Sequence, residues 1–277
     1  MKKITVKQCA KLNITLDVVG VKEEYHLIES FVVPINLMDA VTLKKRKDDK
    51  ITLKQKGIKL DIPSEKNNAF KAAELFTREY KTNGVDIILN KKIPASSGLG
   101  GSSADISAVI KGMQKLYNVK GAEKHLSRLG SDTVFTYYNK QAIISGKGEK
   151  IEFTDFNYSG YAIIITDESP IFSGECYKKF DELKLNPLPC TKKVVELLKT
   201  GQDATEFMKN DLEIPAIKIF PKIKENLTSL LNSGALKAQV AGSGSGVYGI
   251  FKNKKERERA YKKLKTKYGK NLLRVEF

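Results

Sequence analysis

The amino-acid sequence predicts an α+β protein of two closely joined domains, residues 1–155 and residues 156–277. Three observations lead to this prediction. A chain of 277 residues can bury a sizeable core. Segments of strand and helix character alternate along it, without internal repeats or low-complexity linkers. The turn-forming run Asn157-Tyr158-Ser159-Gly160 places the domain boundary near residue 155.

The first domain is predicted to begin with strands, most of which show partial apolar alternation. These strands are predicted over residues 2–6, 12–19, 25–34 and 40–43. A helix over residues 69–80 follows, because Phe70, Ala73 and Phe76 fall on one side of it. The later elements are a strand over 85–89, helices over 105–117 and 121–129, and strands over 142–144 and 150–153.

The second domain is predicted to open on an apolar strand over residues 161–166. It ends with a strand over 247–251, a helix over 255–267 and a strand over 271–276. The late run G-S-G-V-Y-G at residues 244–249 formally fits a dinucleotide-binding glycine pattern. Because it leads into a strand rather than a helix, we do not interpret it as a nucleotide fingerprint.

The most informative segment is the glycine- and serine-rich loop after the strand over 85–89. Its sequence, I-P-A-S-S-G-L-G-G-S-S-A-D, covers residues 93–105. A loop of this kind that opens a helix presents backbone N–H groups and the positive end of the helix dipole to one point. Glycines let the backbone approach an anion closely and serine hydroxyls add donors, so the loop predicts a phosphate-binding site. The alternative is an ordinary capped helix start with a glycine-rich turn.

Two common phosphate loops do not fit this segment. The Walker pattern needs a Lys-Ser or Lys-Thr pair at its end, whereas Ser103 is followed by Ala104 and Asp105. The dinucleotide fingerprint needs a third glycine where Ser103 stands. The loop therefore belongs to another class of phosphate site.

The loop resembles the P-x-x-x-G-L-G/A-S/G-S-S/A pattern of the GHMP small-molecule kinases. Two further segments are similar to motifs of that family and occur in the same order: A-K-L-N at residues 10–13 and G-S-G-S-G at residues 242–246. More narrowly, Y-H-L-I-E-S at 25–30, L-G-S-D-T-V-F at 129–135 and N-D-L-E at 210–213 resemble stretches of one member. The acceptor of that member is a cytidine diphosphate-linked polyol.

The resemblance covers residues 10–251 and includes three departures from the family pattern. Ser102 stands in the last glycine position of the loop, Thr133-Val134 follows Asp132 where V-P is usual, and Gln8-Cys9 replaces a proline before the first motif. None of these departures removes a residue with a chemical role.

The resemblance implies a fold, an activity and a set of partners. The implied fold has a ribosomal-protein-like N-terminal domain and a ferredoxin-like C-terminal domain, with the active site between them. The implied activity is phosphoryl transfer from ATP, with Mg²⁺, to an alcohol of the cytidine diphosphate-linked polyol. Mevalonate, homoserine or a sugar as acceptor remain alternatives within the family.

Two residues are expected to be catalytic. Phosphoryl transfer needs a route for the hydroxyl proton. By resemblance Asp132 is the carboxylate that accepts the proton, and Lys11 is the ion-pair partner that keeps this carboxylate ionised. The alternatives are a structural cap for a helix over residues 133–138 and an ordinary strand lysine.

The resemblance also implies two sets of binding residues. ATP is expected to contact Pro94, Ala95, Ser96, Ser97, Gly98, Leu99, Gly100, Gly101, Ser102 and Ser103, with Asn67 and Lys91 near the adenine. The acceptor is expected to contact Asn13, Tyr25, His26, Phe172, Ser243, Gly244 and Ser245. Tyr25 is expected to stack on the cytosine, His26 to bond its edge and Phe172 to flank it. The alternatives are a core aromatic for Tyr25 and a surface histidine for His26.

The positive charge points to a rival function. Forty-nine Lys and Arg residues against 32 Asp and Glu give a formal charge of +17, which is compatible with an RNA-binding protein on the same fold. The basic residues are nevertheless spread along the chain, and their densest run, K-K-R-K at 44–47, is followed at once by Asp48-Asp49. Because no aromatic residues interleave with them, we expect a solvated lysine-rich surface rather than a nucleic-acid site.

Composition also predicts location. No apolar run reaches the roughly 18 residues of a membrane span, and the first eight residues lack the apolar stretch of a signal peptide. Three scattered cysteines without a C-x-x-C pair fit a reduced cytosol, and two distant histidines argue against a dedicated zinc site. We therefore expect a cytoplasmic enzyme without a dedicated metal-ligand set or a membrane partner, as a monomer or weak homodimer.

Overall fold

The computed structural model describes residues 2–167, 169 and 171–277. Contacts divide the chain into two compact units, each made of several segments. Unit 1 contains the residues up to Ala10 together with Leu37–Ala95 and Gly100–Lys140, and unit 2 contains Lys11–Asn36, Ser96–Leu99 and Gln141–Phe277. These units do not correspond to a single cut in the chain, so the boundary near residue 155 stays a prediction.

Two long strands contribute residues to both units. β1 is Lys3–Asn13 and β3 is Tyr25–Lys45, and the two pair with each other. The sequence predicted two separate strands, over residues 25–34 and 40–43, where β3 is continuous. Proline has no N–H and usually interrupts a ladder. Pro34 is tolerated since it lies between Ile28–Val32, which pair with β6, and the segment from Ala40 on, which pairs with β5.

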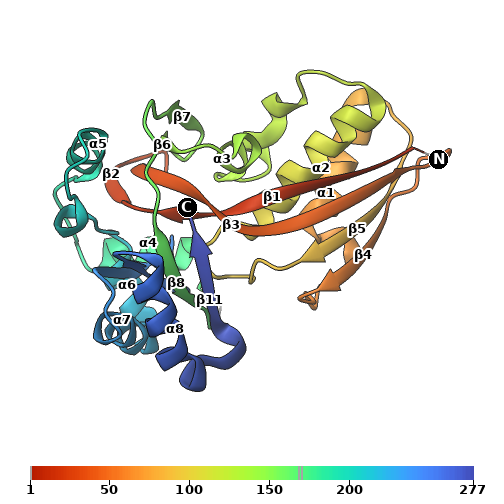
Figure 1. Cartoon of the computed structure of the whole chain (residues 1–277). Coiled ribbons are helices and arrows are strands. Elements are labelled where there is room, and N and C mark those ends of the chain that lie inside the picture. The colour runs from red at the N-terminus through yellow and green to blue at the C-terminus, as the bar shows by residue number, and fades with distance from the viewer. Residues whose placement is uncertain (1, 168, 170) are drawn as a thin grey trace. The chain divides into compact units, whose positions relative to one another are not determined.

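Unit 1 is a helix-covered sheet. The second half of β3 pairs antiparallel with β5 (Val85–Lys91), which pairs parallel with β4 (Thr52–Gly57). Its helices are α1 (Asn68–Tyr80), α2 (Gly101–Tyr117) and α3 (Thr133–Tyr138), with 3-10 turns at Ser64–Lys66 and Ala122–Arg128. α1 and α2 pack side by side (Figure 1). Phe76, Leu89 and Met113 lie in the apolar core that joins these helices to the sheet.

Unit 2 contains a hairpin and a four-stranded sheet. In the hairpin region, β2 (Asp17–Lys22) and β6 (Ala142–Gly146) both pair antiparallel with the first half of β3, and β7 (Lys150–Phe153) pairs with β6. The second sheet has the order β11-β8-β10-β9. These strands are β8 (Tyr161–Ile165), β9 (Lys237–Val240), β10 (Val247–Phe251) and β11 (Leu272–Glu276).

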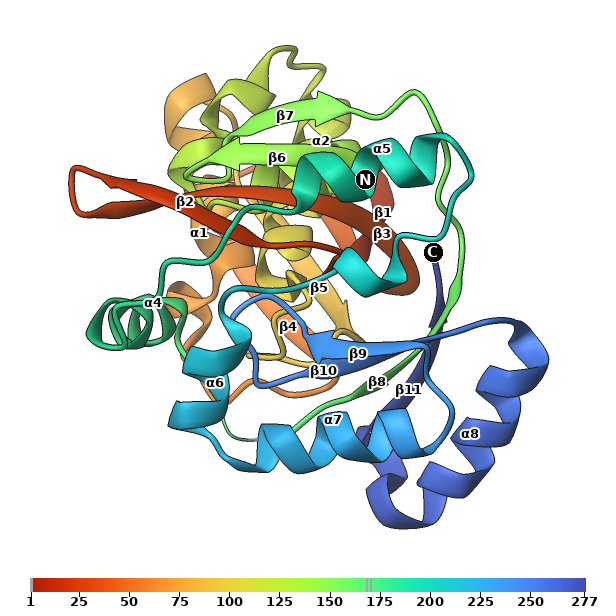
Figure 2. The ribbon, with the colours of Figure 1, turned by 90° about the vertical axis from the view of Figure 1, so that its left-hand side faces the viewer.

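The four-stranded sheet of unit 2 has the strand order of a ferredoxin-like fold, with the first and third strands in the centre. Its helices α7 (Lys222–Asn232) and α8 (Lys254–Tyr268) lie on the same side of the sheet (Figure 2). The remaining helices of unit 2 are α4 (Ser173–Glu182), α5 (Thr191–Lys199) and α6 (Glu213–Ile219), with 3-10 turns at Thr205–Phe207 and Gly269–Asn271. The mixed α and β architecture predicted from the sequence is confirmed.

Several predicted elements differ in extent. The helix predicted over 105–117 already begins at Gly101, because the glycine and serine residues of the loop form its first turn. The helix predicted over 121–129 is a 3-10 helix, Ala122–Arg128. Among the residues that the structure describes, no helix combines the length and the hydropathy needed to cross a membrane.

Candidate active site

The glycine-serine loop has the backbone of an anion-binding turn. Gly98 and Gly100 have φ angles of 72° and 73°, a region that side chains with a Cβ rarely adopt. α2 begins directly after Gly100, and no side chain caps its first turn. The N–H groups of this turn have no acceptor within the helix, so they are available to an anion.

A second glycine loop packs against residues 96–99 within unit 2. A Cβ at Gly98 would lie 1.6 Å from the carbonyl oxygen of Ala241, and one at Gly246 would lie 2.4 Å from that of Ser97. The N–H of Ser245 donates to the carbonyl oxygen of Ser96 at 3.2 Å. Glycine is required at both positions because the two backbones touch without room for a side chain.

Residues at the end of β1 contact both of these loops. The Lys11 N–H donates to the carbonyl oxygen of Leu99 at 3.0 Å, and its Nζ donates to Asn13 Oδ1 at 2.6 Å. That Nζ also lies 3.4 Å from the position of a Cβ at Gly242. Asn13 Nδ2 in turn donates to Ser30 Oγ at 2.8 Å. Lys11 and Asn13, both predicted site residues, therefore lie together beside both glycine loops.

The N-D-L-E segment supports the second loop, a role that the sequence did not reveal. Asn210 Nδ2 donates to the carbonyl oxygens of Val240 and Gly242 at 2.9 and 2.7 Å. Glu213 Oε2 accepts the Val240 N–H at 3.1 Å, and burial raises the pKa of Glu213. These bonds hold the start of the loop from two sides.

The serines of the second loop differ in accessibility. Ser243 is half-buried, and its hydroxyl lies 3.0 Å from that of Ser173 at the start of α4. Ser245 is fully buried, and its Oγ has no hydrogen-bond partner among the described residues. Ser243 is therefore the better placed of the two to offer a hydroxyl to a ligand.

His26 lies in an aromatic and acidic environment made by α4. Its Nε2 is 2.8 Å from Asp181 Oδ1, and its ring stacks on Tyr177 with centroids 4.7 Å apart and planes inclined by 20°. Phe180 meets the same ring edge-on at 6.2 Å. The sequence flagged neither Tyr177 nor Asp181, because α4 itself was not predicted.

The other two predicted aromatic contacts are exposed. Tyr25 is 61% exposed, and the Lys147 Nζ lies 4.1 Å from its ring centre. Phe172, which precedes α4, is 69% exposed. The predicted roles of Tyr25 and Phe172 beside the cytosine stay untested.

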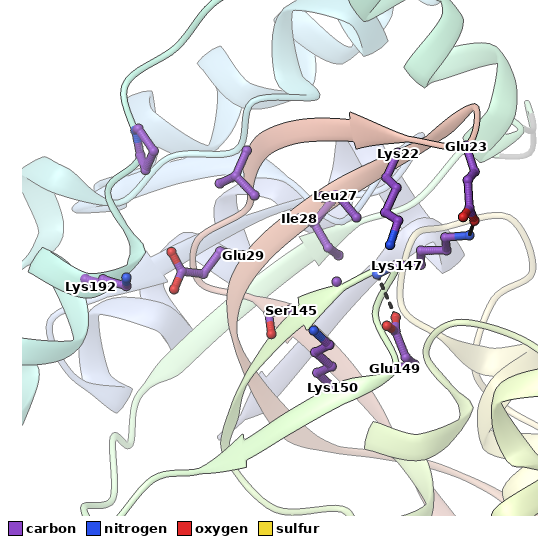
Figure 3. Close-up of a pocket in the computed structure, with 13 residues that line it drawn as sticks. Lys22, Glu23, Leu27, Ile28, Glu29, Ser145, Lys147, Glu149, Lys150 and Lys192 are labelled. Carbon is purple, nitrogen blue, oxygen red and sulfur yellow. Dashed lines mark hydrogen bonds and ion pairs between the residues drawn. The ribbon is translucent and has the colours of Figure 1, made fainter.

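A lysine-rich cavity of about 840 Å³ lies beside the β2–β3 hairpin in unit 2. It is bounded by β2, β3, the β6–β7 turn and the segment before α5, and the ammonium groups of Lys22 and Lys150 extend toward its centre (Figure 3). Lys192 also lines the cavity, and the ammonium of Lys147 donates to Glu23 Oε2 at 3.4 Å. Because His26 is not among the lining residues, this cavity and the His26 environment are separate features.

In unit 1, Asp132 stands at the start of α3. It occupies the N-cap position, yet its side chain makes no capping hydrogen bond. The carboxylate therefore does not serve the structural role that was its alternative interpretation. The predicted pairing of Asp132 with Lys11 links residues of different units and stays a prediction.

Two residues expected near the adenine have contacts within the protein. Asn67 is 2% exposed, and its Oδ1 accepts the Ala69 N–H at 2.9 Å as the N-cap of α1. Lys91 is also 2% exposed, and its ammonium is bound by two carboxylates. Both side chains are therefore directed into the protein, and any contact with a nucleotide stays untested.

Comparison with known proteins agrees with this geometry. Residues 67–140 match the model of the GHMP kinases N terminal domain, and residues 194–271 match that of the GHMP kinases C terminal domain. A 4-diphosphocytidyl-2-C-methyl-D-erythritol kinase from Clostridium tetani is 34% identical over 274 residues, which cover 95% of this chain and 96% of the relative. The chain belongs to the GHMP kinase family.

Further relatives extend the same likeness. A putative 4-diphosphocytidyl-2-C-methyl-D-erythritol kinase from Staphylococcus aureus is 35% identical, covering 91% of this chain and 92% of the relative. A crystal structure of a 4-(cytidine 5'-diphospho)-2C-methyl-D-erythritol kinase has the same fold, with a TM-score of 0.83 at 24% identity over 99% of this chain and 98% of the other. A homoserine kinase from Cytophaga hutchinsonii shares the fold with a TM-score of 0.71 at 16% identity, over 99% and 93% of the two chains. As a GHMP kinase, the chain uses ATP.

Proposed function

We propose that this GHMP kinase is a 4-diphosphocytidyl-2-C-methyl-D-erythritol kinase, which transfers a phosphoryl group from ATP to the 2-hydroxyl of that compound in isoprenoid precursor synthesis. The observation that carries the proposal is the environment of His26, a polar ring held between Tyr177 and Asp181. Mevalonate, homoserine and sugars contain no nucleobase that could stack on or hydrogen-bond to such a group. The names and the high coverage of the relatives support the same acceptor.

ATP is held chiefly by backbone in this proposal. The glycine-serine loop offers N–H groups from Gly98 to Ser103 and the positive end of α2 to the phosphates. Ser102, which replaces a family glycine, accepts a hydrogen bond from Asn68 Nδ2 at 2.5 Å. That bond ties the first turn of α2 to α1, so we assign Ser102 a supporting role in the loop.

Proton transfer is assigned to Asp132, with Lys11 as its partner. An alcohol has a pKa far above 7, so a nearby carboxylate that accepts its proton lowers the barrier. Lys11 favours the ionised carboxylate and stabilises negative charge in the transition state. The bond from Lys11 to Asn13 fixes the direction of the ammonium.

Magnesium fits this site as an ion bound mainly by phosphates and water. The described residues contain no cluster of three or more His, Cys, Asp or Glu side chains that would hold a metal ion alone. Mg²⁺ prefers oxygen ligands and keeps several waters, so the loop hydroxyl of Ser103 would suffice as a protein donor. When bound, the ion neutralises charge on the phosphates.

The decisive experiment is a screen of acceptors. ATP consumption by the purified protein is measured with 4-diphosphocytidyl-2-C-methyl-D-erythritol, mevalonate, homoserine and galactose. We expect turnover with the first compound alone. Turnover with any of the other three, and none with the first, would overturn the proposal.

A further inference from the structure

A line of buried polar groups in unit 2 leads to the Lys11 ammonium. Lys11, Asn13 and Ser30 are 4%, 2% and 0% exposed. The Lys11 Nζ donates to Asn13 Oδ1 at 2.6 Å, and Asn13 Nδ2 donates to Ser30 Oγ at 2.8 Å. Ser30 Oγ donates in turn to the carbonyl oxygen of Thr15. Ser30 closes the Y-H-L-I-E-S segment, whose first two residues are predicted to contact the acceptor.

The direction of each hydrogen bond in this line is fixed at the Thr15 carbonyl. A backbone carbonyl only accepts hydrogen bonds, and a serine hydroxyl has a single proton to donate. Because Ser30 gives that proton to Thr15, its oxygen can only accept from Asn13. The Nδ2 side of the Asn13 amide therefore faces Ser30, and the Oδ1 side faces the Lys11 ammonium.

The reverse orientation of the Asn13 amide is unfavourable at both of its ends. It would point Nδ2, which only donates, at an ammonium that also only donates. It would also place Oδ1 beside the Ser30 oxygen, so the hydroxyl proton would have to turn away from the buried carbonyl of Thr15. Taking that hydrogen bond from a buried carbonyl costs free energy. Ser30 thus decides which end of the amide Lys11 meets.

Thr15 is a firm anchor for this line because β3 and α5 both hold it. Its Oγ1 accepts the Phe31 N–H at 3.0 Å and lies 2.7 Å from the Oγ1 of Thr191, the first residue of α5. The Thr191 hydroxyl donates to the carbonyl oxygen of Glu29 at 3.2 Å, so the Thr15 hydroxyl donates to Thr191. The line therefore ends in backbone and not in a side chain that is free to rotate.

We propose that Ser30 is a positioning residue for phosphoryl transfer, which acts through Asn13 to aim the Lys11 ammonium. A cation that already points in the required direction needs no reorganisation when negative charge develops in the transition state. Ser30 is fully buried beside Asn13, so it acts on the reaction through that amide rather than by direct contact with a substrate. The catalytic part assigned to Lys11 rests on the proposed function.

The first test separates kcat from KM. Ser30→Ala leaves Asn13 Nδ2 without its acceptor, so the amide no longer has a fixed orientation. We expect kcat with 4-diphosphocytidyl-2-C-methyl-D-erythritol to fall on the order of tenfold, and the KM for each substrate to change by less than about threefold. Ser30→Thr keeps the hydroxyl and should restore most of the rate.

Thr166→Val is the matched control. It removes another buried hydroxyl of unit 2 that donates to a backbone carbonyl, that of Asn271 at 3.2 Å. Both variants should lower the melting temperature, whereas only Ser30→Ala should lower kcat. Ser30→Cys, whose thiol has a similar shape and forms weaker hydrogen bonds, takes the place of Ser30→Ala if that variant folds poorly.

A double-mutant cycle tests the path through Asn13. In an Asn13→Ala background the amide is absent, so adding Ser30→Ala should lower kcat no further. Two residues that contributed independently would instead give losses that multiply.

A spectroscopic measurement tests the aim of Lys11 without any substrate. In protein labelled with ¹⁵N-lysine, a buried ammonium held in hydrogen bonds exchanges its protons slowly enough to give a ¹H–¹⁵N signal, and Lys11→Met identifies the signal of Lys11. This signal should shift or disappear in Ser30→Ala and return in Ser30→Thr.

The outcomes separate the role of Ser30 from the proposed function. An unchanged kcat in Ser30→Ala, multiplied losses in the double variant, or an unmoved Lys11 signal would overturn the role of Ser30 and leave the kinase assignment intact. Absence of acceptor turnover by the wild-type protein would instead overturn the proposed acceptor, and the Lys11 signal would still decide whether Ser30 aims the ammonium.

Discussion

At the scale of single residues, two carboxylates near the glycine-serine loop have opposite environments. Asp132 is half-buried at the start of α3 and makes no capping bond, whereas Asp105 is buried against Lys91 and Asp39. The first environment favours a carboxylate that exchanges a proton with a substrate. The second, in which Asp105 is paired with the buried Lys91, favours a structural role next to the loop. Two carboxyls of the same chemistry are thus separated in role by their surroundings.

Replacing Asp132 by Asn should nearly abolish turnover while ATP remains bound. The amide keeps the shape but cannot accept the hydroxyl proton, and such losses are typically on the order of 10²–10⁴-fold in kcat. Steady-state kinetics and AMP-PNP titration measure these effects. The control is Asp155→Asn, which removes a carboxylate from an exposed ion pair with Lys199. A variant that keeps most of its kcat would remove Asp132 from proton transfer.

Replacing His26 or Tyr177 by Ala should weaken the acceptor and leave ATP binding unchanged. Loss of a stacking or edge contact to a base costs roughly 1–3 kcal/mol, by analogy with aromatic contacts to nucleic-acid bases. The KM for the acceptor should therefore rise about ten- to hundredfold. Phe153→Ala, which removes an exposed ring on β7, is the matched comparison. If the affinity for AMP-PNP fell instead, the two substrate sites have been assigned in reverse.

At the scale of elements, the two glycine loops of unit 2 act as one structure. Residues 96–99 and Ala241–Gly246 touch through backbone atoms, and Asn210 and Glu213 hold the second loop from the side of α6. At Gly98 and Gly246 the two backbones approach so closely that neither position has room for a side chain. The shape of the loops is therefore set by backbone conformation and by a few hydrogen bonds.

Replacing Gly98 by Ala should destroy this arrangement. The residue has a φ of 72°, and the new methyl group would overlap the Ala241 carbonyl oxygen. Strained backbone conformations alone cost of order 1–3 kcal/mol, and the overlap adds to this cost. Thermal unfolding and AMP-PNP affinity should both fall. Gly121→Ala, which also has a positive φ but open space around it, isolates the contribution of strain; equal losses in both variants would contradict the packing argument.

The elements that the sequence predicted are those with a strong local pattern. α1, β10 and α8 match their predicted ranges within one residue, because apolar spacing and flanking turns define them. α4 was not predicted, since its first turn contains Gly174 and its apolar face is built from only Cys176 and Phe180. Its partner His26 lies on a distant strand, so the stacking on Tyr177 depends on tertiary structure that local patterns do not contain.

At the scale of the whole molecule, the charge of +17 is compatible with a solvated surface. Several acidic residues form exposed ion pairs, such as Lys199 with Asp155 and Lys222 with Asp167, and such pairs contribute little to stability. The excess of lysine remains available to attract any polyanion weakly. This attraction is distinct from the assigned activity.

Binding to a random RNA or DNA duplex should accordingly be weak and sensitive to salt. Contacts with phosphates alone release counterions, so their affinity falls steeply as salt rises. Fluorescence anisotropy with labelled oligonucleotides at increasing KCl measures this dependence. Tight binding that resists salt and selects a sequence would instead support the RNA-binding alternative.

The contact between the two glycine loops also has a consequence for the order in which the protein is made. Residues 96–99 leave the ribosome long before Ala241–Gly246, the segment that their backbone packs against. At typical rates of synthesis the interval is on the order of ten seconds. During that time the nascent chain has its glycine-serine loop without the partner that shapes it. The loop therefore reaches its final shape only after residues 241–246 have been made.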